Sequence, residues 1–206
     1  MKNVIFTPWV GKNYSKEENK ILILGESHYS DTDFKEKTDF TTDIINIFLQ
    51  YKLGNEGHQS WMNTFTKFTN VLNEGTAEIQ ELENFWNSIM FYNYVQKAVK
   101  GGARVSPSKN DFDISYLALK EVLNKYKPKT IIIWGNRLWN HLPNDDIKLN
   151  NETNIYHFKT GNVDAEILTI HHPSSTSFNR NWQEMKNKPK TLQKNNLKNF
   201  FKNNKI

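Results

Sequence analysis

The sequence of 206 residues contains no cysteine. The protein can therefore form no disulfide bond, no thiolate metal site and no iron–sulfur cluster held by cysteine. No apolar run approaches the roughly 20 residues that are needed to cross a bilayer. The N-terminal stretch VIFTPWV, residues 4–10, is too short for a secretory signal and has a proline near its centre. We therefore expect a cytoplasmic protein that has no membrane association.

Acidic residues are missing from the C-terminal segment 185–206, which carries seven lysines, and the net charge of the whole chain is +5. The simplest interpretation of such a segment is a solvated helix or tail. It also suits a polyanion, because each neutralised phosphate releases counterions. Charge therefore favours a nucleic acid and an acidic partner protein equally.

Four runs rich in apolar residues predict the core strands of one domain over residues 1–206, since the chain has no internal repeat and no long linker. Three of the runs are ILILG (21–25), TIIIWG (130–135) and EILTI (166–170), which are typical of strands that are covered on both faces. The fourth run, SIMFYN (88–93), is less regular but also ends in a polar residue. Residues 185–206 follow as a basic C-terminal helix or tail, and we expect a monomer.

Helical periodicity lies between these strands. Apolar residues at four-residue spacing predict a helix that ends before Pro128: Ile114, Ala118, Val122 and Tyr126. Segment 61–72 predicts a second helix, with one face made of Met62, Phe65, Phe68 or Thr69, and Leu72. Strands that alternate with helices indicate an α/β fold, here a three-layer α/β/α domain with a central, mainly parallel four-stranded sheet.

Polar residues follow each predicted strand. They are Glu26 to Tyr29 after the first strand, Asn93, Gly135 to Arg137, and His171 to Ser177 after the last. Ligands of such sheets bind outside the carboxyl ends of the strands. The sequence therefore predicts one functional site at that edge of the sheet.

Each of these motifs has a structural interpretation as well. Glu26 suits the first turn of a helix, where a carboxylate is favoured, and Asn93 suits a turn. The stretch IHHPSSTSFN (170–179) is either a loop rich in turn residues or part of a site. In the second case a histidine donates to developing charge, and the serines with the backbone N–H groups hold phosphates.

A metal site is the further alternative. Glu26, His28, His171 and His172 are of the residue types that bind zinc or iron. Adjacent histidines rarely bind one metal together, and the chain has no H-E-x-x-H spacing. We therefore expect no metal and no other cofactor.

Taken in chain order, the motifs resemble those of the uracil-DNA glycosylase superfamily over roughly residues 20–180. After its first strand that family has a glycine, a variable residue, an aspartate or asparagine, and a proline; one branch adds a tyrosine, and GESHY (25–29) fits this outline. Later motifs also fit: a serine loop in QSWMNTFTKF (59–68), a base-reading asparagine in FYNYVQ (91–96), KPKTIIIWG (127–135), and the histidine-proline-serine loop HPSSTS (172–177).

The resemblance implies a DNA glycosylase, which hydrolyses the N-glycosidic bond of a base that is flipped out of DNA. It implies catalytic roles for Glu26, Ser27 and His172. The implied base-binding residues are Gly25, His28, Tyr29 and Asn93. The implied DNA-binding residues are Ser60, Gly135, Asn136, Arg137, Ser174, Ser175, Thr176, Ser177 and Phe178.

Three positions depart from the motifs of the superfamily. Ser27 replaces the aspartate or asparagine that orients the attacking water, and His28 replaces the proline. Thr176 replaces the leucine that inserts into DNA, and Phe178 is the nearest bulky residue.

The sequence therefore predicts an enzyme of base excision in DNA repair that acts on uracil or another altered base, including a hypermodified base of phage DNA. Two alternatives stay open. One is a non-catalytic module with the same fold that binds nucleic acid or nucleotides. The other is a metal-dependent hydrolase that uses Glu26 and the histidines.

Overall fold

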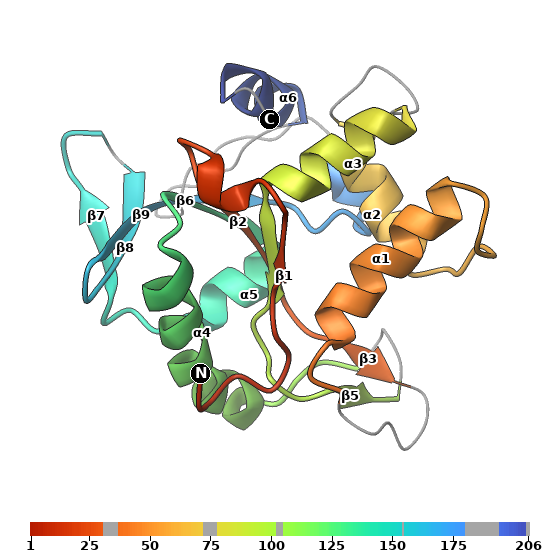
Figure 1. The fold of residues 1–206 in the computed structure, drawn as a ribbon. Helices are drawn as coiled ribbons and strands as arrows, with labels where there is room; N and C mark the ends of the chain where they lie inside the picture. Colours follow the sequence, from red (N-terminus) through yellow and green to blue (C-terminus); the bar gives the residue numbers. More distant parts are fainter. Residues whose placement is uncertain (31–36, 72–77, 102–104, 154, 180–193, 205–206) are drawn as a thin grey trace.

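A computed structural model describes residues 1–30, 37–71, 78–101, 105–153, 155–179 and 194–204 of the protein. In these residues a seven-stranded sheet has the order β1-β4-β2-β6-β9-β8-β7 (Figure 1). Its strands are β1 (Trp9–Val10), β2 (Ile21–Gly25), β4 (Met90–Asn93), β6 (Thr130–Trp134), β7 (Ile147–Asn150), β8 (Ile155–Thr160) and β9 (Val163–Ile170). Strands β3 (Tyr29–Ser30) and β5 (Val99–Lys100) form a separate parallel pair.

Helices pack against both faces of the large sheet (Figure 1). One face is covered by α1 (Phe40–Lys52), α2 (Met62–Thr69), α3 (Ile79–Ser88) and α6 (Lys194–Asn203). The other face is covered by α4 (Lys109–Tyr126) and α5 (Asn136–His141). Two short 3-10 helices, η1 (Tyr14–Lys16) and η2 (Thr176–Asn179), complete the described elements.

The α/β class that the sequence predicts is confirmed, but the prediction of four mainly parallel strands is wrong. The four predicted strands became β2, β4, β6 and β9, which are mutually parallel and adjacent. Strand β1 at one edge and the β7–β8 hairpin at the other pair antiparallel, so that the sheet is mixed. These outer strands lack the continuous apolar run of a strand that is buried on both faces: β1 has two residues, and β7 is half exposed.

Side chains of the central strands alternate between two apolar cores. In β2, Ile21 and Ile23 point to the α1–α3 face, whereas Leu22 and Leu24 point to the face of α4 and α5. Successive side chains of a strand point to opposite faces, so a strand buried on both sides needs an apolar residue at every position. This requirement explains the unbroken ILIL run.

Helix α4 begins with a capping box, in which the Ser108 side chain accepts from the backbone of Asp111, and Lys127 ends it in the left-handed conformation before Pro128. The predicted buried face was only partly right. Ala118 and Val122 are buried, but Ile114 is 58% exposed. A strict four-residue spacing advances 400° for each step on a helix of 3.6 residues per turn, so the predicted row drifts by about 40° a step and leaves the core.

Helix α2 and the C-terminal segment add aromatic residues to the core. Met62, Phe65, Phe68 and Thr69 of α2 are buried as the sequence predicts, whereas Leu72 lies outside the described residues. In α6, Leu197 and Phe201 are buried, and the Phe201 ring packs 5.1 Å from that of Phe85. Residues 185–193 and 205–206 of the lysine-rich segment lie outside the described residues.

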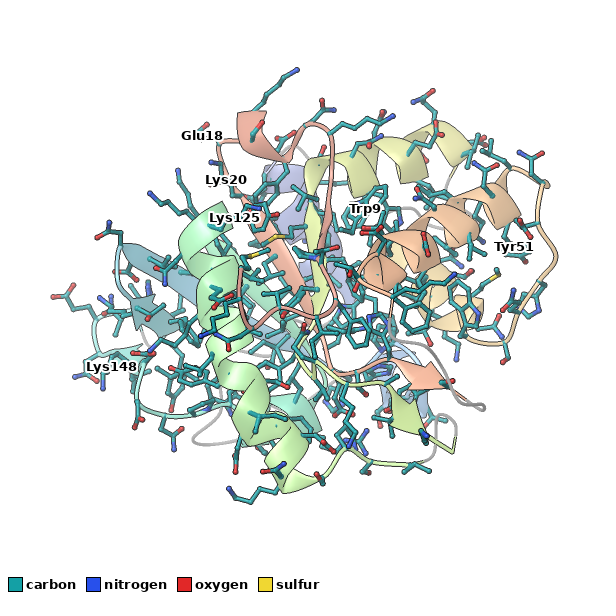
Figure 2. The ribbon with its side chains drawn as sticks, turned by 60° about the horizontal axis from the view of Figure 1, so that its bottom comes forward. Trp9, Glu18, Lys20, Tyr51, Lys125 and Lys148 are labelled. Carbon is teal, nitrogen blue, oxygen red and sulfur yellow. The ribbon has the colours of Figure 1, made fainter. Side chains whose placement is uncertain are left out.

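Basic side chains are also found far from the carboxyl edge of the parallel strands. Lys20 immediately precedes β2, and Lys125 lies in the last turn of α4 before β6, so both lie at the amino end of the strands (Figure 2). Lys148 lies on β7, at an outer edge of the sheet. Across the described parts of the chain, no helix is long and apolar enough to span a bilayer.

Two leucines of α4 allow a matched test of this packing. Leu119 is 1% exposed and Leu117 is 56% exposed. We expect Leu119→Ala to lower the free energy of unfolding by about 2–5 kcal/mol, because it removes apolar contacts and leaves a cavity. Leu117→Ala should change it by less than about 0.5 kcal/mol. Urea unfolding of both variants measures the difference, and equal losses would contradict the orientation of α4.

Candidate functional site

The candidate residues meet where neighbouring strands send the chain to opposite faces of the sheet. Strands β2 and β6 are adjacent and parallel. After β2 the chain continues to α1 on one face, whereas after β6 it continues to α5 on the other. The diverging connections define a topological switch point, outside whose carboxyl ends α/β proteins bind ligands.

An ion pair joins the two strand ends across this point. The Arg137 guanidinium donates from Nε to Glu26 Oε2 at 2.7 Å and from Nη2 to Oε1 at 2.5 Å. Glu26 is 8% exposed, and the Arg137 side chain is 47% exposed. These hydrogen bonds raise the pKa of Arg137, with burial acting against them. The carboxylate of this pair is therefore buried, whereas the Arg137 side chain keeps contact with solvent.

Two further side chains extend this ion pair. The Tyr29 hydroxyl donates to Glu26 Oε1 at 3.3 Å, and Arg137 Nη1 donates to Ser106 Oγ at 2.5 Å. A carboxylate can accept about four hydrogen bonds. Arg137 and Tyr29 account for three of them, so the Glu26 carboxylate retains one acceptor position for a water or a ligand.

His172 has a defined tautomer. Its Nδ1 lies 3.2 Å from the backbone nitrogen of Ser174, which can only donate, and 2.7 Å from the Ser174 hydroxyl. Nδ1 is therefore an acceptor, and the proton of the neutral ring is on Nε2. Burial lowers the pKa of His172; Glu26 acts against that effect, and Arg137 adds to it. The result is a neutral imidazole that offers an N–H donor.

Close contact between two loops holds His172 near Arg137. Gly135 has a φ of +95°, and a Cβ at this position would lie 3.3 Å from the Cβ of His172. The backbone N–H of Gly135 also donates to Ile170 O at 2.8 Å. A residue with a side chain is disfavoured at this φ and would press on His172, which explains the glycine before α5.

Asn93 lies directly opposite Gly25 in the parallel register of β2 and β4. Its Oδ1 is 2.2 Å from the place that a Cβ of Gly25 would occupy. No side chain fits there while Asn93 keeps this position, and Asn93 is itself 7% exposed. The pair therefore requires a glycine at the end of β2.

His28 is placed behind Asn93, away from solvent. It is 2% exposed, and its ring packs 4.9 Å from the ring of Phe6 and 4.5 Å from that of Phe40. Its nitrogens lie 2.9 Å from Thr41 Oγ1 and 3.1 Å from Asn93 Nδ2. Burial lowers the pKa of His28 to about 3. His28 is thus a neutral, buried support of Asn93 and not an exposed group.

The remaining predicted residues lie at the strand ends, in the last loop and before α2. Ser27 Oγ is buried and has no hydrogen-bond partner among the residues that the structure describes. In the last loop, the backbone N–H of Ser177 donates to Ser175 Oγ at 3.1 Å, and Thr176 is exposed. Asn136 begins α5, next to Arg137. Ser60 is exposed in the turn before α2, with no hydrogen bond to the other candidates in the described part of the chain.

Phe178 does not lie where the resemblance implies. The sequence predicts it as the bulky substitute for a side chain that inserts into DNA. Phe178 is 4% exposed and belongs to the core on the α1–α3 face. Its apolar ring is buried because η2 turns the chain back onto the sheet, so it is not presented to a ligand at the surface.

Sequence reasoning missed several partners in the site. Thr41 lies 13 positions from His28 and Ser106 lies 31 positions from Arg137, and no local pattern marks either hydroxyl residue. The pairing of Glu26 with Arg137 was missed too, although both residues were candidates. Within the described residues, no group of three or more histidine, aspartate or glutamate side chains is arranged to hold a metal ion.

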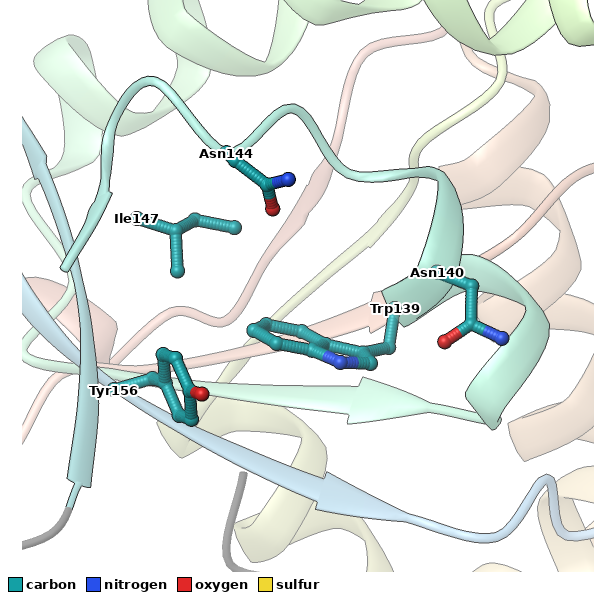
Figure 3. Close-up of a pocket in the computed structure, with 5 residues that line it drawn as sticks. All are labelled: Trp139, Asn140, Asn144, Ile147 and Tyr156. Atoms are coloured by element: carbon teal, nitrogen blue, oxygen red, sulfur yellow. The ribbon is translucent and has the colours of Figure 1, made fainter. Parts of the chain in front are cut away.

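A hollow of about 510 Å³ lies elsewhere, between α5 and the β7–β8 hairpin (Figure 3). Its lining residues are Trp139, Asn140, Asn144, Ile147 and Tyr156. None of them is a predicted site residue, and none carries a charge. We place the candidate functional site at the strand ends, because charged and imidazole side chains gather there and the hollow is lined by uncharged side chains.

Burial of neutral His28 predicts a dependence of stability on pH. The unfolded chain binds a proton on this histidine below about pH 6.5, whereas the folded protein does so only near pH 3. Stability is therefore fully present above about pH 6.5. It should fall as the pH is lowered, by up to about 1.4 kcal/mol per pH unit.

Unfolding by urea between about pH 6.5 and pH 5 measures this loss before most carboxylates titrate. The His28→Phe variant keeps an aromatic ring and removes the titrating group, so its stability should vary less with pH. Equal pH slopes for the two proteins would contradict the placement of His28.

Comparison with known proteins adds no independent assignment. No protein-family model matches the chain, and no curated protein matches it. What the geometry provides is a carboxylate–guanidinium pair, a neutral imidazole donor and a buried amide at one edge of the sheet. Together these groups can bind a planar polar ring, donate to a developing anion and hold a water molecule.

Proposed function

We propose that the protein is a DNA glycosylase, which hydrolyses the N-glycosidic bond of a flipped-out uracil or another altered base. The observation that carries this proposal is the tautomer of His172. Its Nδ1 accepts from the backbone N–H of Ser174, so that a neutral Nε2–H donor is available beside Glu26 and Arg137.

The leaving base sets the first chemical requirement. When the bond between sugar and base breaks, the electron pair goes to the base, and a uracil anion carries this charge on its carbonyl oxygens. A fixed N–H donor in a partly buried site stabilises such an anion more than water does. A neutral imidazole with its proton on Nε2 is such a donor, and the lowered pKa of His172 favours the neutral ring.

The sugar and the water set the second requirement. Positive character develops on the sugar as the base leaves, and the Glu26 carboxylate favours it electrostatically. The remaining acceptor position of Glu26 suits the attacking water. The unpaired Ser27 hydroxyl can contribute a further hydrogen bond to that water. Water then supplies the hydroxyl group to the sugar, and the base departs with a proton.

Recognition of the base is assigned to Asn93 and Tyr29. The Asn93 amide has a donor and an acceptor side by side, which matches the O4 acceptor and the N3–H donor of uracil. The Tyr29 hydroxyl is tied to Glu26, so its ring is restrained. A restrained ring at this position would exclude a 5-methyl group by its bulk.

Contacts with the DNA backbone are assigned to the last loop and to basic residues. Hydroxyl groups from Ser174 to Ser177 are of the kind that bind phosphate, whereas the backbone N–H groups of Ser174, Ser175 and Ser177 already donate within the loop. The Arg137 guanidinium pairs with Glu26 and with the Ser106 hydroxyl, and the Arg137 side chain is 47% exposed. Together with the lysine-rich C-terminal segment, these groups would bind the negatively charged backbone of DNA.

A second candidate function is a non-catalytic module that binds nucleic acid or nucleotides. One observation favours it: Arg137 engages both oxygens of Glu26, which reduces the electrostatic effect of that carboxylate on a sugar cation. Excision assays separate the two functions, because the module would bind altered DNA without releasing a base.

The direct test uses a panel of oligonucleotides that carry uracil and other altered bases, followed by alkaline cleavage of abasic sites. We expect the wild-type protein to produce abasic sites and His172→Ala to lose about 10²–10³ in rate, as for removal of one donor to a developing anion. The exposed His58 provides the control, because His58→Ala leaves the site unchanged. A larger loss in His171→Ala would assign the donor to the neighbouring histidine.

Arg137 offers a test of orientation against DNA contact. Arg137→Lys keeps the charge but loses the two-pronged geometry that holds Glu26. We expect kcat/KM to fall about tenfold, the effect of one lost charge-assisted hydrogen bond, while the salt dependence of DNA binding stays the same. Arg137→Gln should also lower the salt slope by about 1 if the guanidinium contacts a phosphate. Normal activity in Arg137→Lys would show that the ion pair does not orient Glu26.

A further inference from the structure

We propose that the hollow between α5 and the β7–β8 hairpin is a second binding site, which takes a neutral nucleobase or nucleoside. It lies apart from the strand ends, and none of its five lining residues belongs to the candidate site. The inference therefore does not rest on the proposed function. At about 510 Å³ the hollow is within the range of about 300–1,000 Å³ that is usual for small-molecule sites.

Two aromatic rings form a corner of this hollow. The ring centroids of Trp139 and Tyr156 are 5.4 Å apart, and the ring planes meet at 65°. Both side chains pack against the apolar core on the face of α4 and α5, and both are only partly buried. Each ring is therefore restrained by the core, while part of its surface stays open to solvent.

Such a corner suits a flat aromatic ligand better than a saturated one. Aromatic rings prefer offset stacking or edge-to-face contact. A ring that stacks on the Trp139 indole would meet the Tyr156 ring close to edge-to-face, because the two planes are already 65° apart. One aromatic ligand can thus make both favourable contacts, whereas a sugar ring has no π-face to stack.

Two amides supply the polar contacts of the hollow. Asn140 follows Trp139 on α5, and Asn144 lies in the connection to β7. Figure 3 shows the Asn144 side chain pointing into the space above the indole. Both asparagines are exposed, and within the described chain neither amide has a hydrogen-bond partner. An amide offers a donor beside an acceptor, and the edge of a nucleobase offers complementary groups.

The charges around the hollow favour a neutral ligand. Two carboxylates, Asp145 and Asp146, lie in the connection between α5 and β7, and Lys120 pairs with Asp146 at 3.2 Å. Lys148 follows the lining residue Ile147 on β7, so its side chain points to the opposite face of the sheet. A phosphate group would therefore find no lysine or arginine in the lining and would have carboxylates next to the lining in the chain.

The six tryptophans allow a test that separates the hollow from the strand ends. Each indole N–H gives one signal in a ¹H–¹⁵N spectrum, and the variants Trp139→Phe and Trp134→Phe assign two of these signals. Trp139 lines the hollow, whereas the Trp134 ring lies edge-on to that of His172 at 6.0 Å. The Trp139 signal therefore reports on the hollow, and the Trp134 signal reports on the strand ends.

We expect uridine and adenosine to shift the Trp139 signal until it saturates, with a Kd on the order of 1 mM or lower. Uridine 5′-monophosphate should bind more weakly than uridine, and ribose should leave the signal in place. Tighter binding of the monophosphate, or an equal shift by ribose, would overturn the assigned ligand class. A shift of the Trp134 signal alone would place nucleosides at the strand ends and overturn the second site.

Matched variants test the second aromatic ring, with the Trp139 signal as the readout. Tyr156→Leu removes the ring, and we expect the affinity for uridine to fall about tenfold, the size of effect that loss of an aromatic contact with a base produces. Tyr156→Phe keeps the ring and should bind uridine as the wild-type protein does. Equal losses in the two variants would show that the aromatic corner does not bind the ligand.

An exposed position provides a test that does not disturb the core. We expect Asn144→Ala to lower the affinity for uridine about three- to tenfold, the effect of one lost hydrogen bond. Asn110→Ala, at an exposed asparagine of α4, is the control and should leave the affinity unchanged. If neither Asn144→Ala nor Tyr156→Leu weakens the response of the Trp139 signal, the inference is wrong, whether or not the protein excises a base.

Discussion

The parallel register of β2 with its neighbours is the constraint on which the site depends. Gly25 lies opposite Asn93 on one side, and Leu24 lies opposite Ile133 on the other. Because the strands end level, the residues that follow them emerge at one edge. A shift of β2 by one residue would turn every side chain to the opposite face. It would exchange the apolar side chains of β2 between the two cores and separate Asn93 from Gly25.

The ion pair of Glu26 and Arg137 is built upon this register. It joins two connections that run to opposite faces of the sheet. The pair therefore links the end of β2 to the end of β6. A carboxylate that is 8% exposed is unfavourable without a partner. The Arg137 side chain is about half exposed. The same pair therefore neutralises a buried carboxylate and leaves part of a cationic side chain at the surface of the strand ends.

The core of the fold could be read from the sequence, and its edges could not. Strands such as β2 and β6 have an apolar residue at every position, because both faces are buried. The β7–β8 hairpin has no such run. Convergence of Glu26, Asn93 and Arg137 at one edge also follows from the parallel sheet. The ion pair spans 111 positions of the chain, and a single sequence offers no signal for such a partner. His28 illustrates the same limit, since adjacent polar residues after a strand do not reveal which of them turns inward.

Two histidines of the candidate site are buried in different surroundings, and burial lowers the pKa of each. The Nδ1 of His172 accepts from the backbone N–H of Ser174, so the proton of the neutral ring is on Nε2. His28 is 2% exposed, and its ring contacts the Asn93 amide and the Thr41 hydroxyl inside the core. The difference arises from the chain that carries each ring. His172 lies in the loop after β9, whereas the chain after β2 turns His28 inward between Phe6 and Phe40.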